Sequence, residues 1–529
     1  MSSVTVGAPV LARLQLRRDR IWWPLWTFVV VSIAVVTPTS YEQLYPDPAE
    51  RANLTRTVGS NGSLLALTGP AYDLSNAGGF VAWRILSFLS ATAGLAALMS
   101  VVRHTRAEEE SGRMELLRSG VLGRAASLAS ALAGVVGWAV VVGGLTVLGL
   151  VGVGLPAAGS AVFGAGLAAT MVAFGGVGAL AAQITEHART ARGIAGAALG
   201  VAYLLRAAAD ASPSLSALGW VSPLGWPQRA QPFAGNRWWV LLLPLALGIL
   251  TAAGAFALER RRDVGAGLVA ARLGPADGRM GSVGALVARL QRPSLVAWAV
   301  GVLVFSIVFG GVAPGLADIV DQNPGMADVL RRMGGDQALM LTFFAAVLPI
   351  LLGVGMLHGV GALARLDGEE EAGRAELVLS TGASRAQLFL GHLAWAVLGA
   401  VLLAALAGVG LVIGYALAGG REDLASDVLT GAMTYVGPML VVIGVAALAL
   451  GLRARGTRLG WAYAGVVLLL VWVGALLRLP DAVLGLSPFD HLPQQPGNPV
   501  AWTPLLVELA LAAALMAAGL VAYRRRDLG

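Results

Sequence analysis

The sequence contains no cysteine and no lysine, and it is poor in charge. Because there is no cysteine, disulfides, thiol catalysis and thiolate metal sites are excluded. All 37 basic residues are arginine and only 13% of the 529 residues are charged, whereas a soluble protein carries about 25%. The lack of lysine also excludes a Walker A loop, which needs that residue to reach the nucleotide phosphates. Any ATP hydrolysis therefore has to take place on another polypeptide.

Long apolar runs take the place of the missing charge. Hydrophobic residues make up 57% of the chain, and runs of about 20 of them recur, which is enough to cross a hydrocarbon core of about 30 Å as helices. The many short alternating segments of a β-barrel are absent. We therefore predict an all-α integral membrane protein with about 12 transmembrane helices, near residues 21–38, 80–102, 125–152, 158–183, 192–209, 238–257, 295–313, 338–361, 387–417, 430–452, 458–478 and 502–523.

The arginines are distributed unevenly over this arrangement. With both termini on the cytoplasmic side, 27 of the 37 arginines fall in cytoplasmic segments and seven in the opposite loops, which is the positive-inside pattern. Arginine in place of lysine, with much Ala, Gly, Val and Leu, is typical of a GC-rich bacterial genome. We expect a multi-pass protein of a bacterial cytoplasmic (inner) membrane with cytoplasmic N- and C-termini. Its net charge of +7 then reflects topology and contact with membrane lipid, and no nucleic acid partner is expected.

An acidic motif occurs twice in the chain. "EEESGRMELLRSG" begins at Glu108 and "EEEAGRAELVLSTG" begins at Glu369, and nine of 17 positions are identical between 108–124 and 369–385. Shorter matches keep a similar offset: "ARL" at Ala12 and Ala288, "ARG" at Ala191 and Ala454, "SP" at Ser222 and Ser487, and "RRRD" at Arg260 and Arg524. Since six spans per half give both halves the same orientation, the pattern predicts two parallel six-helix repeats.

The repeat also predicts the domain organisation. The first six-helix half covers residues 1–257, a cytoplasmic linker covers 258–293, and the second half covers 294–529. The start of the chain, "VLARLQLRRDR", has apolar residues on one side and indicates an interfacial amphipathic elbow helix. An ordinary basic flank to the first span is the alternative.

Each acidic motif lies between the second and third spans of its half, on the expected cytoplasmic side. Glu109 and Arg113 are spaced i,i+4, as are Glu370 and Arg374, which favours a short exposed amphipathic helix. A solvated loop whose carboxylates favour a helix N-terminus is the simpler interpretation of one copy. Loops diverge easily, however, so the recurrence favours a shared role in docking a partner.

The two motifs resemble the signature loop of the fused twelve-span ABC-2 type exporter permeases of actinobacteria, the polyketide-antibiotic or tetronasin-type exporters. The resemblance covers essentially the whole chain and implies that the loops are coupling helices that dock on ATPase subunits. By residue match, that role falls to Glu108, Glu109, Glu110, Gly112, Arg113 and Glu115, and to Glu369, Glu370, Glu371, Gly373, Arg374 and Glu376. Arg118 and Val121 stand where the second copy has Leu379 and Gly382, so the two docking sites need not be equivalent.

The resemblance implies a function for the whole chain. It would be the permease subunit of an ATP-driven exporter that effluxes lipophilic or amphipathic small molecules such as antibiotics and drugs, and so confers resistance. The chain itself would be no enzyme and would hold no cofactor, because ATP and Mg would be bound by an ABC ATPase partner, expected in two copies. A proton-coupled secondary drug transporter is the alternative, since such proteins can also be parallel repeats.

A few polar residues lie within the expected spans. Glu508 is the one carboxylate there, and charges inside a membrane are functional candidates. Arg206 and Arg478 lie near outer ends of spans, where either could pair with Glu508, so the three residues mark either a structural ion pair or a substrate pathway. The five histidines have no ligand spacing, so no metal site is expected, and no catalytic residue is assigned.

Overall fold

The computed structural model describes residues 5–39, 62–118, 122–211, 213–263, 265–269, 281–321, 335–420, 423–453, 455–473 and 480–526, together with single residues or pairs between 41 and 58. All named elements in these ranges are helices, which confirms the predicted all-α membrane fold. Ten helices are long and apolar enough to cross a membrane. Two further predicted spans coincide with α2, which meets these criteria only together with α1, and with α22, which is shorter.

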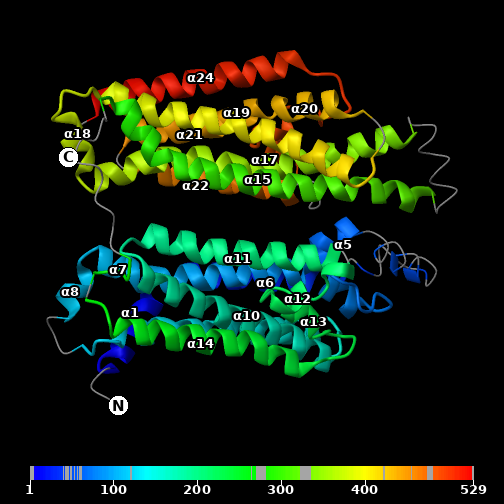
Figure 1. Cartoon of the computed structure of the whole chain (residues 1–529). Coiled ribbons are helices and arrows are strands. Elements are labelled where there is room, and N and C mark those ends of the chain that lie inside the picture. The colour runs from blue at the N-terminus through cyan, green and yellow to red at the C-terminus, as the bar shows by residue number, and fades with distance from the viewer. Residues whose placement is uncertain are drawn as a thin grey trace. The chain divides into compact units, whose positions relative to one another are not determined.

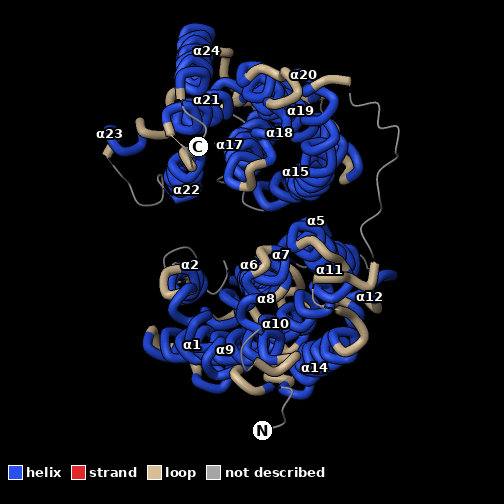
Figure 2. Tube along the Cα trace, turned by 90° about the vertical axis from the view of Figure 1, so that its left-hand side faces the viewer, coloured by secondary structure: helices blue, strands red, loops and turns tan. Residues whose placement is uncertain are grey.

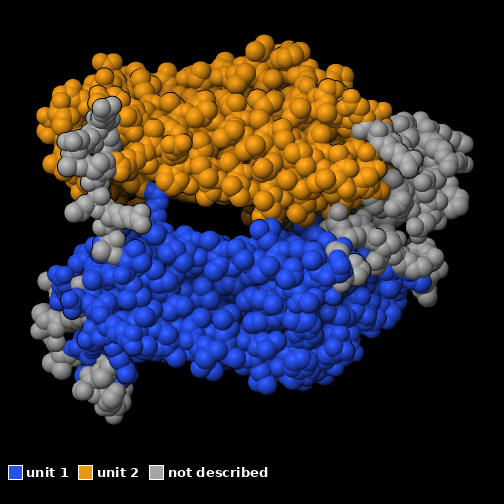
Figure 3. All heavy atoms as spheres, viewed as in Figure 1, with its two compact units in different colours: residues 1–274 blue, residues 275–529 orange. Residues whose placement is uncertain are grey.

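The chain forms two compact units, Met1–Gly274 and Pro275–Gly529, which are coloured separately in Figure 3. The boundary falls inside the segment 258–293 that the sequence assigns to a linker. The last part of that segment is helical, because α15 begins at Val283 and continues through Pro293. Proline is tolerated inside membrane helices, where neighbouring groups satisfy the freed backbone.

The first unit contains twelve helices and two 3-10 turns among its described residues. They are α1 (Ala8–Arg18), α2 (Trp22–Val36), α5 (Gly62–Thr68), α6 (Ala77–His104), α7 (Arg106–Glu110), α8 (Arg113–Arg118), α9 (Ala126–Gly152), α10 (Ala157–Ile184), α11 (Ala188–Ala211), η2 (Pro213–Leu215), α12 (Leu218–Val221), α13 (Trp226–Arg229), η3 (Trp238–Leu241) and α14 (Leu242–Glu259). Seen end-on, α10 is surrounded by α6, α9 and α14 (Figure 2). The α1 and α2 helices meet at 67°.

The second unit is built around α17. Its elements are α15 (Val283–Asp321), α17 (Gly335–Glu371), α18 (Arg374–Leu379), α19 (Arg385–Leu417), α20 (Ala425–Thr434), α21 (Val436–Leu452), α22 (Thr457–Val473), α23 (Asp481–Leu484), η4 (Pro488–Asp490) and α24 (Trp502–Arg525). The α17 helix contacts α15, α19, α21 and α22, and α24 packs on α21 (Figure 2). A large apolar core follows these contacts.

Glycine allows the closest helix contacts in both units. A Cβ on Gly164 of α10 would lie 2.5 Å from the carbonyl oxygen of Gly143 of α9, and one on Gly451 of α21 would lie 2.2 Å from that of Gly519 of α24. These separations are too short for any side chain, so the backbones touch, as is usual between small residues in membrane helices.

Each unit has one end that carries the acidic motif. In Figure 1, α7 and α8 lie at one end of unit 1, and α12 and α13 lie at the other. In unit 2, α18 lies at the end where the chain terminates (Figure 1). We call these the motif ends of the two units.

Candidate functional site

The acidic motif adopts the same turn in both units. A helix ends at Glu110 or Glu371, a glycine follows two residues later, and the short helix α8 or α18 begins directly after it. Gly112 and Gly373 have φ angles of 73° and 69°, which glycine adopts without the strain that a side chain would add. The glutamates therefore end the preceding helix rather than begin an exposed one.

The predicted exposure is wrong for Glu108 and Glu109 of the first triplet, although Glu110 is exposed. The predicted i,i+4 pairing is wrong in both units. Glu108 and Glu109 are each only 8% exposed. Arg113 approaches Glu108 at 3.9 Å rather than Glu109, and Arg374 pairs with Glu369 at 2.5 Å rather than Glu370. The i,i+4 rule fails because the partners do not belong to one helix, since the glycine turn lies between them.

Glu109 is held by two arginines from different parts of unit 1. Arg262, just after α14, donates to both carboxylate oxygens at 2.8 Å, and Arg106 donates to Oε2 at 2.9 Å. Arg262 also donates to Gln183 Oε1 at the end of α10, at 2.7 Å. Arg124, which precedes α9, donates to the carbonyl oxygen of Arg262 at 2.6 Å.

Glu370 is held by the corresponding residues of unit 2. Arg526, just after α24, pairs with Glu370. It also donates to the carbonyl oxygen of Leu450 at the end of α21, at 3.0 Å. Arg385, the match of Arg124, donates to the carbonyl oxygen of Arg526. Sequence reasoning did not assign Arg262 or Arg526 a role, although the repeated "RRRD" motif contains both.

The third glutamate of each triplet reaches the start of the fifth span. Glu110 accepts a hydrogen bond from the backbone nitrogen of Ala188, the first residue of α11, at 2.9 Å. Glu371 pairs with Arg455, which precedes α22, at 2.6 Å. We call Glu108, Glu109, Glu110, Glu369, Glu370 and Glu371 the inner glutamates, because each is engaged by its own unit.

The short helices present a different group of side chains to the outside. Met114 of α8 and Ala375 of α18 are buried against their own units. The exposed side chains, which we call the outer face, are Arg113, Glu115, Arg374, Glu376 and Leu377. Leu377 is a large apolar residue that is 69% exposed. The side chains of 116–118 and all of Val121 lie outside the described residues.

The N-terminal helix also contacts the motif. Arg18 donates to Glu108 at 2.7 Å, and Asp19, at the break between α1 and α2, pairs with Arg103 and His104 of α6. Leu11 and Gln15 face the unit, whereas Val10, Leu14 and Leu16 are exposed. This apolar surface is suited to the membrane interface.

Of the three candidate pathway residues, Arg206 belongs to unit 1 and Glu508 to unit 2. Arg206 is buried in unit 1, where it donates to the carbonyl oxygens of Ala66 and Leu67 at 2.6 and 3.1 Å and lies 3.6 Å from Asp210. Asp210 lies inside α11, so Glu508 is not the only carboxylate in a span. In unit 2, Glu508 is 5% exposed and its oxygens have no hydrogen-bond partner among the described residues. Arg478 lies outside the described residues.

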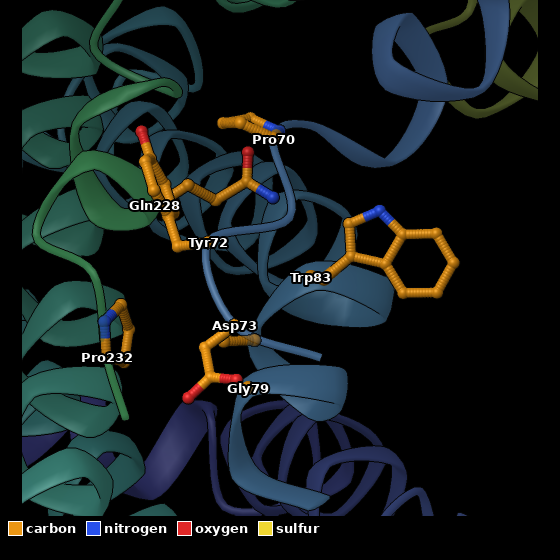
Figure 4. Close-up of a pocket in the computed structure, with 8 residues that line it drawn as sticks. Pro70, Tyr72, Asp73, Gly79, Trp83, Gln228 and Pro232 are labelled. Atoms are coloured by element: carbon orange, nitrogen blue, oxygen red, sulfur yellow. The ribbon is translucent and has the colours of Figure 1, made fainter. Parts of the chain in front are cut away.

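Two hollows open in unit 1 away from the motif. The smaller has about 10 Å³ of free space, between the segment with Pro70 and Asp73 on one side and Gln228 of α13 and Pro232 on the other (Figure 4). The larger, of about 420 Å³, shares Tyr72 with it and is lined by Trp220, Arg229 and Arg237 among others. No group of three or more histidine and carboxylate side chains in the described ranges could hold a metal ion.

Known proteins match this chain over most of its length. A family model described as the C-terminal domain of the multidrug efflux system permease Rv1217c matches residues 280–524. The multidrug efflux system permease protein Rv1217c of Mycobacterium tuberculosis is 37% identical over 526 residues, which cover 99% of this chain and 95% of the relative. The resemblance to exporter permeases is thereby confirmed, and the chain belongs to the family of the multidrug efflux system permease Rv1217c.

Proposed function

We propose that this chain is the membrane permease of an ATP-driven exporter and that its ATPase is a separate polypeptide that docks on the two acidic loops. The relative is named a multidrug efflux permease, and a chain without lysine has no Walker A loop of its own. The observation that carries the proposal is that both loops are held in their units by matching contacts, Glu109 with Arg262 and Glu370 with Arg526. The two halves therefore present their loops in the same way.

The outer face of α8 and α18 is the proposed docking surface. Four of the inner glutamates have side chains no more than 13% exposed and are engaged within their own units, so their carboxylates are poorly placed to meet a partner: Glu108, Glu109, Glu369 and Glu370. Glu115 and Glu376 are exposed at matching positions, and Leu377 adds an apolar contact in the second loop. Two such surfaces fit two ATPase copies, which bind the ATP and Mg.

The proposed location is a bacterial cytoplasmic membrane with the motif ends and both termini in the cytoplasm. The distribution of arginine supports this orientation, because arginine-rich segments stay on the cytoplasmic side. The cargo is proposed to be a lipophilic or amphipathic small molecule such as an antibiotic. ATP binding and cargo binding must each favour one of two states of the permease, because a ligand shifts an equilibrium only by its differential affinity.

Co-purification of the permease with a candidate ABC ATPase tests the docking surface. We expect two ATPase molecules per permease in the wild-type complex. Glu115→Arg and Glu376→Arg should each release one of them, and the double variant should release both. Asp481→Arg is the matched control, because Asp481 is an exposed carboxylate of α23, away from the motif.

The outcomes separate the proposal from its rivals. If the ATPase stays bound to the double variant, the outer face is not its docking surface. If no ATPase associates with the wild-type permease and efflux follows the proton gradient, the chain is a secondary transporter.

A further inference from the structure

We propose that Arg262 and Arg526 are positioning residues that join each docking loop to the third, fourth and sixth spans of its own half, so that loop and spans move as one body. This inference rests on the proposed function, because it concerns how movement of a docked ATPase reaches the membrane helices. It assigns a role to the "RRRD" repeat, which the docking proposal leaves unexplained.

The arrangement occurs twice with matched residues. Glu109 and Glu370 are 261 positions apart, as are Arg124 and Arg385, while Arg262 and Arg526 are the third residues of the two "RRRD" motifs. Residues that meet in unit 1 have counterparts that meet in unit 2. An incidental surface pair would not be expected to recur at three separate sequence positions.

Each arginine connects several elements at once. The guanidinium of Arg526 contacts Glu370 in the loop and the carbonyl oxygen of Leu450 at the end of α21. Its own carbonyl oxygen accepts from Arg385 at the start of α19, and its position fixes it to the end of α24. The loop is thereby tied to three membrane helices through one residue.

Arg262 makes the same set of connections in unit 1. It contacts Glu109 in the loop and Gln183 at the end of α10, follows α14, and accepts from Arg124 before α9. Arginine suits this task because its planar fork can donate in several fixed directions, which a lysine ammonium cannot do. The interaction with a carboxylate is also stronger than one between neutral groups.

The loop needs such a connection to transmit force. The α18 helix has six residues, and a helix this short is not stable by itself. Without the arginine, a docked ATPase would move α18 on its glycine turn, at Gly373, while the spans stayed in place. Docking would then persist but no longer be coupled to transport.

A charge exchange in unit 2 tests this role, measured on the permease–ATPase complex in membrane vesicles. Glu370→Arg and Arg526→Glu should each reduce ATP-dependent drug efflux by about tenfold, and the double exchange should recover most of it, as expected for directly coupled residues. ATPase co-purification should stay at the wild-type level in all three variants. Arg526→Lys, which keeps the charge but not the fork, should lower the drug-stimulated part of ATP hydrolysis more than the basal part.

The distance between the loop and α24 is a second readout, and a change in the stability of the protein alone would not alter it. Because the chain has no cysteine, spin labels can be placed on Ser380→Cys, after α18, and Val521→Cys, on the exposed surface of α24. We expect a narrow distance distribution in the parent, a broad one with Glu370→Arg, and a narrow one again after the exchange.

Asp481→Arg is the matched control, because Asp481 is an exposed carboxylate of α23 in the same unit and lies outside the docking loop. It should leave efflux and the distance distribution unchanged. Unaltered efflux with Glu370→Arg, or a loop that stays ordered without the pair, would overturn the inference. Failure of the wild-type permease to bind any ATPase would instead overturn the proposed function.

Discussion

Glu109 in the first half receives hydrogen bonds from two buried arginines, Arg106 and Arg262, whereas the equivalent Glu370 in the second half pairs with Arg526. The Glu109 side chain is 4% exposed and that of Glu370 is 11% exposed. The contact with the sixth span is therefore common to both halves, and the additional arginine is specific to the first.

The difference arises at one pair of matched positions. Arg106 and Asp367 are 261 positions apart and carry opposite charges. Each nevertheless contacts a helix end whose partial charge is opposite to its own. Arg106 donates to the carbonyl oxygen of Ala182 near the end of α10, at 2.8 Å. Asp367 accepts from the backbone of Arg455 and Thr457 at the start of α22. Cations favour helix C-termini and anions favour N-termini, so both choices stabilise their own half.

The largest expected effect is the loss of Glu109. Glu109→Ala leaves two buried arginines without a carboxylate, which should lower the free energy of unfolding by about 3–5 kcal/mol. Glu370→Ala should cost about 1.5–3 kcal/mol, the range for a hydrogen bond to a charged group. Thermal unfolding of the purified variants in detergent measures both, with the exposed Glu115→Ala as control. Equal losses would show that Arg106 adds nothing to the first site.

An intermediate effect is expected at Asp367. Asp367→Ala removes the acceptor at the start of α22 and should cost about 0.5–2 kcal/mol, as for other helix caps. Hydrogen exchange should rise at the backbone amides of Arg455 and Thr457 and remain unchanged at the start of α11. Faster exchange at α11 would mean that the cap is not specific to the second half.

The smallest effects are expected at the third glutamate of each triplet. Glu371→Gln breaks an exposed pair with Arg455 and should cost about 0–1 kcal/mol, an effect that salt reduces. Glu110→Ala removes the acceptor of the Ala188 amide and should cost about 1 kcal/mol. Thermal unfolding measures both losses, and hydrogen exchange at the Ala188 amide should rise only in Glu110→Ala. Unchanged exchange at this amide would contradict the assignment of Glu110 as its acceptor.

The two halves also differ at the helices that lead into their first spans. In unit 1 the chain breaks at Asp19, where the side chain is paired with Arg103 and His104, and α1 turns away from α2. In unit 2 the matched stretch is part of the single helix α15. The "ARL" match at Ala12 and Ala288 predicts related segments, but the partners of Asp19 at the bend are remote in sequence.

The sequence by itself determined the membrane fold, the helix positions and the recurrence of the acidic loop. The length of each apolar run and the repeated motif can be read directly from the sequence. Each span has to satisfy its own backbone hydrogen bonds in lipid, so an apolar run of that length is a helix. The sequence also showed that Gly112 and Gly373 match in the two motifs, but the turn at these glycines was not predicted from it.

Only the tertiary structure decided which way the glutamates point. Spacing along one helix suggested exposed i,i+4 pairs, but a turn and three spans bring Arg262 and Arg526 to Glu109 and Glu370 from more than 150 positions away. Arg206 likewise finds Asp210 and the carbonyl oxygens of Ala66 and Leu67. A buried charge pairs with whatever the packing of the helices brings near it, because leaving it unpaired is costly, and that proximity is not encoded by local spacing.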